Sequence, residues 1–448
     1  METAFAFSQE REMDLALEYI EKAIEIAPNE PELIYFRGSA KFFIGDDEGA
    51  IEDLDRVIAQ NRHHGLAYVY RGAAKSALGM HWEGIKDLNT AIRIDPKNPL
   101  AYFHRAMAYQ YNREGVIFGP GAELLKAISD FDWAIKLQPR NADYWYLRGR
   151  AKAHCAGFKQ EIVLSDYEKA LEIDPKFAKA HFGIGTYMAE KGDFPKAIEE
   201  LTKSIELDPN FALGYSNRAM AKKLSGDYHG ALADFDRAVE IEPENGLFWF
   251  NRGSLKGCID EIPYEEQVGD LDVAIKLCPD EPEIYYIRGI SKRDFQRFAE
   301  AIEDFEKELE FRQDNPKTYY YLANCKGKVA KYTAEERLRN YDMAIELGCD
   351  IPECYVERGF LRHKIGDYPG AIKDAYQYID LCPQSLKGYE LAICVDYDVG
   401  NPDGALKLIE KALSIDPNYE FGLKVKKLIL DERARLTKYP LWEVPPGK

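Results

Sequence analysis

The sequence predicts an all-α protein, an α-solenoid of about twelve helix–turn–helix repeats with a helix that caps its C-terminal end. Helix-like runs such as AIRIDP, SIELDP and ALSIDP each end in a proline. The spacing is 34 residues from Pro175 to Pro209, and again from Pro209 to Pro243. Gly-Asp pairs such as Gly192-Asp193 fall between the two helical runs of a repeat, where a helix must stop and a new one must start.

The closing prolines set the boundaries of the repeats, which we expect to form one continuous solenoid over residues 1–438. The repeats lie near 1–30, 31–64, 65–98, 99–141, 142–177, 178–211, 212–245, 246–281, 282–315, 316–351, 352–385 and 386–419. Residues 420–438 are amphipathic and are expected to cap the last apolar surface. A proline-rich tail follows at 439–448. We expect its Leu441 and Trp442 to dock on the last repeats or in the groove.

Two positions recur in nearly every repeat. The fourth is aromatic in most repeats: Tyr68, Tyr102, Trp145, Tyr215, Trp249, Tyr285, Tyr319, Tyr355 and Tyr389. The eighth is small: Gly38, Gly72, Ala106, Gly149, Gly185, Ala219, Gly253, Gly289, Ala323 and Gly359. Paired helices approach closely only where one face is nearly bare. This pattern resembles the tetratricopeptide repeat over essentially the whole chain. The resemblance implies a right-handed superhelix with a concave groove lined by first-helix residues.

An arginine at the seventh position occurs together with an aspartate on the second helix of the same repeat. The predicted pairs are Arg37 with Asp53, Arg71 with Asp87, Arg105 with Asp130, Arg148 with Asp166, Arg218 with Asp234, Arg252 with Asp270, Arg288 with Asp304, and Arg358 with Asp374. Repeats without the arginine have Ile184, Leu322 or Ala392 there, and they lack the aspartate as well. Joint presence and joint loss favour a structural ion pair between the two helices. A ligand surface made of arginines is the less favoured interpretation.

The resemblance also implies that positions two, five, six, nine, twelve and thirteen face the groove. Position five is often aromatic. The candidate groove residues are Tyr35, Tyr70, Phe103, Tyr146, Phe182, Asn217, Phe250, Asn251, Tyr286 and Tyr320. The rings can anchor a peptide, because aromatic side chains dominate binding energy at desolvated contacts. Packing against the next repeat is an equally weighted explanation. Asn217 and Asn251 resemble two rungs of an asparagine ladder that holds a peptide backbone.

The family's clamp for the C-terminal carboxylate of heat-shock chaperones is not predicted. It needs lysine, asparagine and arginine at fixed positions, and around Asn217 this chain has Phe182, Thr186, Leu247 and Asn251 instead. Two local departures from the repeat remain. An insertion at 112–123 is expected to fold back onto the neighbouring repeat, with a partner contact as the alternative. Thr333 and Glu336 predict a capping box at the start of a second helix.

Catalytic and metal-binding motifs are not found in the sequence. It has no G-x-x-x-x-G-K-[ST] loop, G-x-S-x-G or H-E-x-x-H. His63-His64 falls at a repeat junction and is not expected to hold a metal. We therefore expect no enzyme, no cofactor and no metal.

Charge and cysteine usage narrow the class of partner. The net charge of −18 disfavours nucleic acid and anionic membranes. The 8 scattered cysteines suit a reducing cytoplasm. We predict a cytoplasmic, non-catalytic scaffold or adaptor that binds extended protein segments in its groove. A self-associating structural array, with a homo-oligomer as its product, and a peptide-sensing regulator are the alternatives.

Overall fold

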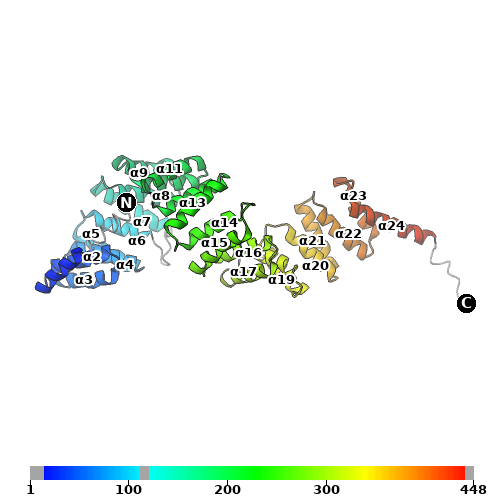
Figure 1. Cartoon of the computed structure of the whole chain (residues 1–448), viewed down its shortest axis with the longest axis horizontal. Coiled ribbons are helices and arrows are strands. Elements are labelled where there is room, and N and C mark those ends of the chain that lie inside the picture. The colour runs from blue at the N-terminus through cyan, green and yellow to red at the C-terminus, as the bar shows by residue number, and fades with distance from the viewer. Residues whose placement is uncertain (1–14, 111–120, 439–448) are drawn as a thin grey trace. The chain divides into compact units, whose positions relative to one another are not determined.

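The computed structural model describes residues 15–110 and 121–438, and within these ranges every regular element is an α-helix (Figure 1). The predicted all-α solenoid class is thereby confirmed. The chain forms two compact units, Met1–Pro243 and Glu244–Lys448, and each is described by itself. Continuity of the array across them stays a prediction. The predicted tail, the first part of the repeat at 1–30 and most of the insertion at 112–123 lie outside the described residues.

In the first unit, each first helix packs against the second helix of its own repeat and, from α4 onward, against the second helix of the repeat before it (Figure 1). A helix over residues 15–26 comes first. It is followed by α2 (Pro31–Phe43), α3 (Asp47–Gln60), α4 (Gly65–Ala77), α5 (His81–Ile94), α6 (Pro99–Tyr109), α7 (Gly121–Leu137), α8 (Ala142–His154), α9 (Gln160–Ile173), α10 (Ala178–Glu190), α11 (Phe194–Leu207), α12 (Ala212–Leu224) and α13 (Tyr228–Ile241). The largest apolar cluster includes Phe131, Tyr167 and Met188, which are almost fully buried between neighbouring repeats.

The second unit repeats the same packing. Its helices are α14 (Gly246–Lys256), α15 (Tyr264–Leu277), α16 (Pro282–Asp294), α17 (Phe298–Phe311), α18 (Pro316–Lys326), α19 (Ala334–Glu346), α20 (Glu353–Lys364), α21 (Tyr368–Leu381), α22 (Leu386–Asp398), α23 (Pro402–Ile415) and α24 (Glu420–Lys438). The last of these covers the end of the array. Ile429 is buried against the final core cluster, and the Tyr397 hydroxyl donates to Glu432 at 3.0 Å.

Gly-Asp pairs end one helix and begin the next within three residues. Gly45 has φ 83° and follows the C-cap of α2, so it takes the left-handed conformation that glycine adopts without steric cost. The backbone N–H of Asp46 then donates to the carbonyl of Lys41 at 2.9 Å, as in a Schellman motif. The Asp46 side chain is also the N-cap of α3 and accepts from the N–H of Gly49 at 3.0 Å. The two residues together fix the tight turn between paired helices.

Three repeats have longer turns between their helices, at 155–159, 257–263 and 327–333. In the last of these, Thr333 accepts from the N–H of Glu336 at 3.2 Å. The Glu336 carboxylate accepts from the N–H of Thr333 at 2.8 Å. The predicted capping box is confirmed, and it restarts a helix where the chain lacks the Gly-Asp pair.

The seventh-position arginines form a row of bidentate contacts that we call the arginine ladder. In the best placed example, Arg218 Nε and Nη2 donate to the two carboxylate oxygens of Asp234 at 2.8 and 2.6 Å, and Asp234 is only 4% exposed. The same two-bond contact joins Arg37 to Asp53, Arg71 to Asp87, Arg105 to Asp130, Arg148 to Asp166, Arg252 to Asp270, Arg288 to Asp304, and Arg358 to Asp374. Each contact joins the two helices of one repeat.

In addition to the predicted arginine, most ladder aspartates receive a second cation. It comes from the residue one helical turn after the ladder arginine. Asp87 accepts from Lys75 at 2.8 Å, Asp270 from Lys256 at 2.9 Å, Asp304 from Lys292 at 2.8 Å, and Asp374 from Arg362 at 3.1 Å. These four aspartates are buried, and a buried carboxylate has room for more donors than one guanidinium supplies. In these repeats the predicted pair is therefore part of a cluster of one carboxylate and two cations.

Most ladder arginines also reach the preceding repeat within their unit. Arg148 Nη1 donates to Asp132, on the second helix of the repeat before, at 2.6 Å. Its guanidinium carbon lies 4.6 Å from the ring centre of Trp145, the fourth-position aromatic. The guanidinium is therefore shared among three helices and one ring.

The fourth-position aromatics close the repeat boundary as well. The Tyr102 hydroxyl donates to the carbonyl of Pro96 at 3.2 Å, and the indole N–H of Trp145 donates to the carbonyl of Pro139 at 3.0 Å. A proline carbonyl at the end of a second helix is thus paired by the next first helix. The chain uses tyrosine and tryptophan at this position because both carry a polar group beyond an apolar ring.

The repeat at 178–211 replaces the ladder pair with a different one. His181 Nδ1 lies 2.7 Å from the Glu200 carboxylate, and Lys203 donates to the same carboxylate at 2.8 Å. The hydrogen bond with His181, together with Lys203, lowers the pKa of Glu200 from 4.5 to about 2. Glu200 is mostly buried, so its ionised form is stabilised by the fold.

A double-mutant cycle tests the ladder. Asp234→Ala leaves the half-buried Arg218 guanidinium without its carboxylate, so we expect a loss of about 3 kcal/mol in unfolding free energy. Adding Arg218→Ala should cost little more, because the two side chains act as one unit. The matched control is the exposed pair Arg237 and Glu240 on the same helix, at 2.8 Å. Its coupling energy should be far smaller, because water screens exposed charges. Equal coupling in both pairs would refute the structural role.

Acid titration tests the Glu200 contact. Because the folded-state pKa of Glu200 is depressed, its contribution to stability is present above pH about 4.5 and is lost as pH falls toward about 2. Glu200→Gln should therefore be destabilising at neutral pH, with a difference from the wild type that shrinks across that window. Denaturant midpoints measured at several pH values give the result. Glu199→Gln, at the exposed neighbouring carboxylate, is the control. A difference that stays constant with pH would rule out the linkage.

Candidate functional site

The position-five aromatics of the first unit lie between neighbouring repeats. Tyr35 and Tyr146 are buried, 8% and 6% exposed, while Phe103 and Phe182 are half-buried. The ring of Phe103 lies 5.2 Å from that of Tyr144, at the start of the next repeat. Tyr35 and Tyr146 are thus mainly packing residues, and the other two keep a surface for a ligand.

Two further rings pack against the last residue of their own repeat. Tyr146 lies 5.8 Å from Phe177, and Phe182 lies 4.8 Å from Phe211 in a T-shaped contact. Position six contributes Tyr70, whose ring lies 6.2 Å from Tyr35. Rings at positions five and six therefore join successive first helices and line the surface between them.

In the second unit the predicted residues are arranged in the same way. Tyr286 packs on Phe305, with ring centres 6.3 Å apart, and Tyr320 packs on Tyr341 at 6.2 Å. Phe250 is half-buried beside the core cluster around Leu271 and Ile284. These residues do not line a common cavity. Tyr286 alone among them borders a cavity, which is shallow and open.

The two predicted ladder asparagines belong to different units. Asn217, in the first unit, donates through Nδ2 to the hydroxyl of Thr186 at 3.1 Å. It thereby joins α12 to α10. Asn251 lies half-buried in α14 of the second unit. Each asparagine is described only within its own unit. An asparagine ladder formed by both residues therefore stays a prediction.

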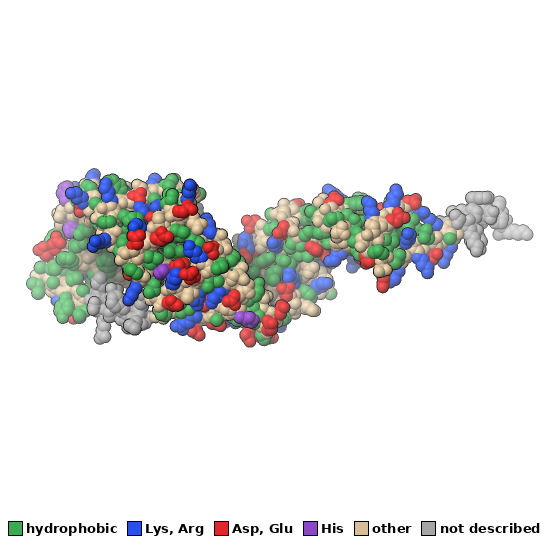
Figure 2. All heavy atoms as spheres, turned by 90° about the horizontal axis from the view of Figure 1, so that it is seen from above, with side chains coloured by type: hydrophobic (Ala, Val, Ile, Leu, Met, Phe, Trp, Pro, Cys, Tyr) green, Lys and Arg blue, Asp and Glu red, His purple; other side chains and the backbone are tan. Residues whose placement is uncertain are grey.

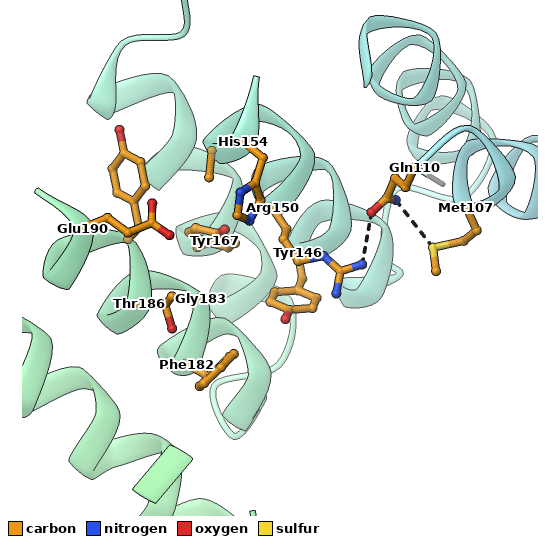
Figure 3. A pocket seen from close by; sticks show the side chains of 12 residues that line it. Met107, Gln110, Tyr146, Arg150, His154, Tyr167, Phe182, Gly183, Thr186 and Glu190 are labelled. Carbon is orange, nitrogen blue, oxygen red and sulfur yellow. Dashed lines mark hydrogen bonds between the residues drawn. The ribbon is translucent and has the colours of Figure 1, made fainter. Parts of the chain in front are cut away.

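A cavity of about 370 Å³ opens on the first helices of the first unit, and we call it the Arg150 pocket (Figure 3). Residues from α6, α8, α9 and α10 surround it. They are Met107, Gln110, Tyr146, Arg150, Ala153, His154, Tyr167, Phe182, Gly183, Thr186, Tyr187 and Glu190. The volume is that of a large side chain with room to spare, and the lining is mostly aromatic or aliphatic. Tyr146 and Phe182 are the predicted groove residues that the structure brings together here.

One polar contact orients the arginine of this pocket. Arg150 Nη2 donates to the Gln110 side-chain oxygen at 3.1 Å, and Gln110 is 1% exposed. The Gln110 amide in turn contacts the sulfur of Met107 at 3.6 Å, as the dashed lines of Figure 3 show. The guanidinium also lies over the Tyr146 ring, 5.9 Å from its centre. Arg150 is therefore held at the wall of the pocket by an amide and a ring.

Burial sets the protonation states around the cavity. It raises the pKa of the Tyr146 phenol and lowers the pKa of the His154 imidazole, with Arg150 nearby further lowering the latter. Both groups are therefore neutral at pH 7. The charges at the pocket are those of Arg150 and of Glu190, which lies exposed on the opposite wall. The site combines an apolar interior with hydrogen-bond donors and one charge of each sign.

Gly183 makes room for this cavity. A Cβ atom at this position would lie 2.8 Å from Cε1 of Tyr167 and 3.1 Å from Cε2 of Tyr146. Tyr167 is 2% exposed and has nowhere to move. Position six of this repeat must therefore stay bare for the two tyrosine rings to form the floor of the pocket.

A second cavity of about 330 Å³ lies along the same first helices, and we call it the His104 pocket. Its lining consists of Phe42, Ala73, Ser76, Ala77, Gly79, His81, His104, Met107 and Ala108. Burial lowers the pKa of His104 to about 4, so the imidazole is neutral at physiological pH. Met107 lines both cavities, so the two pockets are neighbours on one face.

The predicted ion-pair residues take no part in either pocket. The ladder arginines lie on the first helices but turn toward the second helices, where their carboxylates are buried. The aspartates concerned are Asp53, Asp87, Asp130, Asp166, Asp234, Asp270, Asp304 and Asp374, and neither cavity has any of them in its lining. With their oxygens occupied by arginine or lysine, these carboxylates offer little to a ligand. Their contacts favour a structural role over a binding surface.

The pocket residues that sequence reasoning missed occupy positions nine, twelve and thirteen. Arg150 and Thr186 are at position nine of their repeats, Gln110 at twelve and Glu190 at thirteen. These positions were expected to face the groove, so the signal was available. The candidate residues were chosen at positions five and six, where most are aromatic, and positions nine, twelve and thirteen contributed none.

Residues 15–110 and 121–438 contain no group of three His, Cys, Asp or Glu side chains arranged to hold a metal ion. His64, one of the predicted histidine pair, is the N-cap of α4, and its Nδ1 accepts from Ala67 at 3.1 Å. None of the helices in these ranges is both long and apolar enough to span a bilayer.

Acidic and basic side chains are interspersed on the face that Figure 2 shows, with hydrophobic side chains between them. A single-sign patch would favour nucleic acid or an anionic surface. The mixture seen here, with a net charge of −18 over the chain, favours a protein partner.

Comparison with known families agrees with the fold. A model described as tetratricopeptide repeat matches residues 4–30, 178–211 and 212–245. The chain thus contains tetratricopeptide repeats. It is 34% identical to Hsp70-Hsp90 organizing protein 2 of Arabidopsis thaliana over 83 residues. The matched segment covers 18% of this chain and 14% of that relative, so the chain spans about a seventh of its length.

Solved structures are similar at the level of the repeat array. The Cut9–Hcn1 assembly of the APC/C matches with a TM-score of 0.41 and 14% identity, over 94% of both chains. Yeast Tom70 matches with a TM-score of 0.37 and 16% identity, over 97% of this chain and 95% of its own. Tetratricopeptide arrays are in general scaffolds for protein–protein interaction, and they are typically non-catalytic.

Substitution of Gly183 tests whether the pocket floor depends on a missing Cβ. Gly183→Ala forces Tyr167 or Tyr146 to shift in a close-packed region, so we expect a loss of about 1–3 kcal/mol in unfolding free energy. The matched control is Gly269→Ala, at a helical glycine where an added Cβ meets nothing within 4 Å. That variant should gain about 0.5–1 kcal/mol from helix propensity. If both variants shift the denaturant midpoint in the same direction, the packing argument fails.

Proposed function

We propose that this tetratricopeptide protein is a non-catalytic scaffold that binds an extended peptide segment across the Arg150 and His104 pockets. One observation carries the proposal: two cavities of about 370 and 330 Å³ lie in a row on the first helices of one unit, with Met107 between them. Extended segments present alternate side chains toward the same surface, so neighbouring pockets suit them.

The lining of each pocket indicates what it accepts. The His104 pocket is formed by aliphatic carbons, one phenyl ring and neutral imidazoles, so it suits an apolar side chain. The Arg150 pocket adds a guanidinium and phenol groups to an aromatic interior. It suits a side chain with an apolar stem and a hydrogen-bonding end.

The spacing of the two anchor side chains follows from helix packing. The pockets are centred one to two repeats apart, and neighbouring helices pack about 8–10 Å from each other. An extended chain advances about 3.3 Å per residue, so the two anchors should lie about four to six residues apart. A short linear segment is therefore long enough to occupy both.

The cysteines and the net charge bear on where the protein is located and on which class of partner it binds. All 8 cysteines are free thiols, which supports a reducing, cytoplasmic location. The acidic net charge supports protein rather than nucleic acid as the partner. Self-association is the second candidate, since exposed apolar residues such as Leu423, Leu428 and Leu430 of α24 remain 45–48% accessible. Measuring mass in solution at several concentrations decides between a monomeric receptor and an array.

Blocking substitutions test the peptide site. Ala153 lines the Arg150 pocket and Ala77 lines the His104 pocket, and tryptophan at either position fills space without removing a core side chain. We expect twelve-residue peptides selected from a random library on the wild-type protein to bind Ala153→Trp at least about tenfold more weakly, as anchors at interface centres do. Isothermal titration gives the affinities. Ala59→Trp, on the exposed face of the second helix α3, is the control.

Two outcomes would contradict the proposal. Selected peptides that bind all three tryptophan variants equally well would place the binding surface elsewhere. Peptides that show a single anchor residue, with affinity lost in only one pocket variant, would contradict occupancy of both pockets. Folding of each variant is checked by its unfolding midpoint, so that loss of structure is not taken for loss of binding.

A further inference from the structure

Two cysteines meet in the connection between α19 and α20. The Sγ atoms of Cys349 and Cys354 lie 3.2 Å apart. Cys354 is buried and Cys349 is half-buried. A disulfide bond is about 2.05 Å long, so the two sulfurs need to approach each other by only about 1 Å. This separation is small compared with the range that side-chain rotation covers.

Backbone hydrogen bonds hold both cysteines in place. The α19 helix ends in a Schellman motif, in which Gly348 donates to Ile345 at 3.0 Å and Cys349 donates to Ala344 at 2.9 Å. Cys354 lies in the first turn of α20, and its N–H donates to Ile351 at 3.1 Å. The approach of the two thiols is therefore set by the ends of two helices.

The pair occupies positions that other repeats fill differently. At the junction after the repeat at 246–281, the corresponding residues are Pro279 and Ile284. Pro279 closes that repeat, and Ile284 is fully buried. The junction at 349–354 thus lacks the closing proline and has two thiols where the other has a rigid ring and an aliphatic side chain. No other two cysteines of the chain are spaced by five residues.

The repeat that ends at this junction also lacks the ladder pair between its two helices. It has Leu322 and Asn340 at the two ladder positions. The buried side-chain nitrogen of Asn340 has no hydrogen-bond partner. An unpaired buried amide is destabilising, and no arginine ties α18 to α19 at this level. A covalent link at the end of α19 would therefore add stability in a repeat where the ladder is interrupted.

We propose that Cys349 and Cys354 form a thiol modification site, which oxidised glutathione converts into an intramolecular disulfide. The Cys349 thiolate attacks one sulfur of glutathione disulfide, which forms a mixed disulfide and releases one glutathione thiolate. The Cys354 thiolate then attacks Cys349 Sγ and releases the second glutathione. Two protein thiols lose two electrons and two protons, and glutathione disulfide is reduced to two glutathione molecules. Reduced glutathione in excess reverses the reaction.

Accessibility and protonation assign the order of these steps. Cys349 is the more exposed thiol, so it meets the tripeptide first. Burial raises the pKa of Cys354, and its contact with Cys349 raises that pKa further. The second step consumes the Cys354 thiolate, so closure of the disulfide becomes faster as pH rises.

Mass spectrometry of the full chain tests the site. The reduced protein is incubated with glutathione disulfide, and the expected product is lighter by about 2 Da, with Cys349 and Cys354 joined in the peptide map. Cys354→Ser should instead accumulate one glutathione on Cys349, and Cys349→Ser should form no internal bond. Cys278→Ser and Cys382→Ser are the matched controls and should oxidise like the wild type. A wild-type product that keeps a glutathione adduct on Cys349, or in which Cys349 and Cys354 both remain reduced, overturns the proposal.

Hydrogen exchange tests what the bond does to the fold. Oxidation should slow amide exchange in the last turn of α19 and the first turn of α20 by about tenfold, because it links two helix ends that otherwise open independently. Exchange in the first unit should stay unchanged and serves as an internal reference. Equal exchange at the junction in the oxidised and reduced proteins would show that the disulfide does not tie the helices, and would overturn the structural part of the proposal.

Discussion

The guanidinium at the seventh position of a repeat is the contact on which the array depends. Within the first unit, Arg148 binds Asp166 of its own repeat and Asp132 of the one before, and it stacks on Trp145. Burying a charge is costly unless its hydrogen bonds are satisfied, and here several donors of one side chain are used. A solenoid has contacts only between neighbours. One residue that joins three consecutive helices therefore fixes their register, and its repetition carries that register along each unit.

Where the arginine is absent, the chain uses other contacts and gains other features. The repeat at 178–211 has Ile184 in its place and uses His181 with Glu200 to join its helices. The first helix of that repeat also supplies Phe182 and Gly183 to the Arg150 pocket. The repeat at 316–351 lacks the arginine too, and the two neighbouring thiols lie at its end. Two interruptions of the ladder thus coincide with the Arg150 pocket and with the cysteine pair.

Periodicity made the fold predictable from the sequence, because each helix, turn and small residue is specified locally and then repeated. The joint occurrence of Arg218 with Asp234 and its counterparts also indicated which side chains share a repeat, although not the second cation that joins most of them. The candidate site could be predicted less well from the sequence than the fold. Tyr146 and Phe182 occupy equivalent positions, yet one is buried and the other half-buried, because the neighbouring rings differ. The Arg150 pocket exists because Gly183 lacks a Cβ in front of Tyr167, and a residue pattern does not report that three-dimensional coincidence.

Two arginines of α8 show how one helix carries both a ladder contact and a residue of the proposed binding site. An α-helix turns by about 100° per residue, so Arg148 and Arg150 point to nearly opposite sides. Arg148 contacts aspartates and stays with the scaffold, whereas Arg150 contacts Gln110 and faces a cavity. Residues at positions four, seven and eight are constrained by contacts within and between repeats. Several residues at positions nine, twelve and thirteen, such as Arg150, Gln110 and Glu190, line a cavity instead.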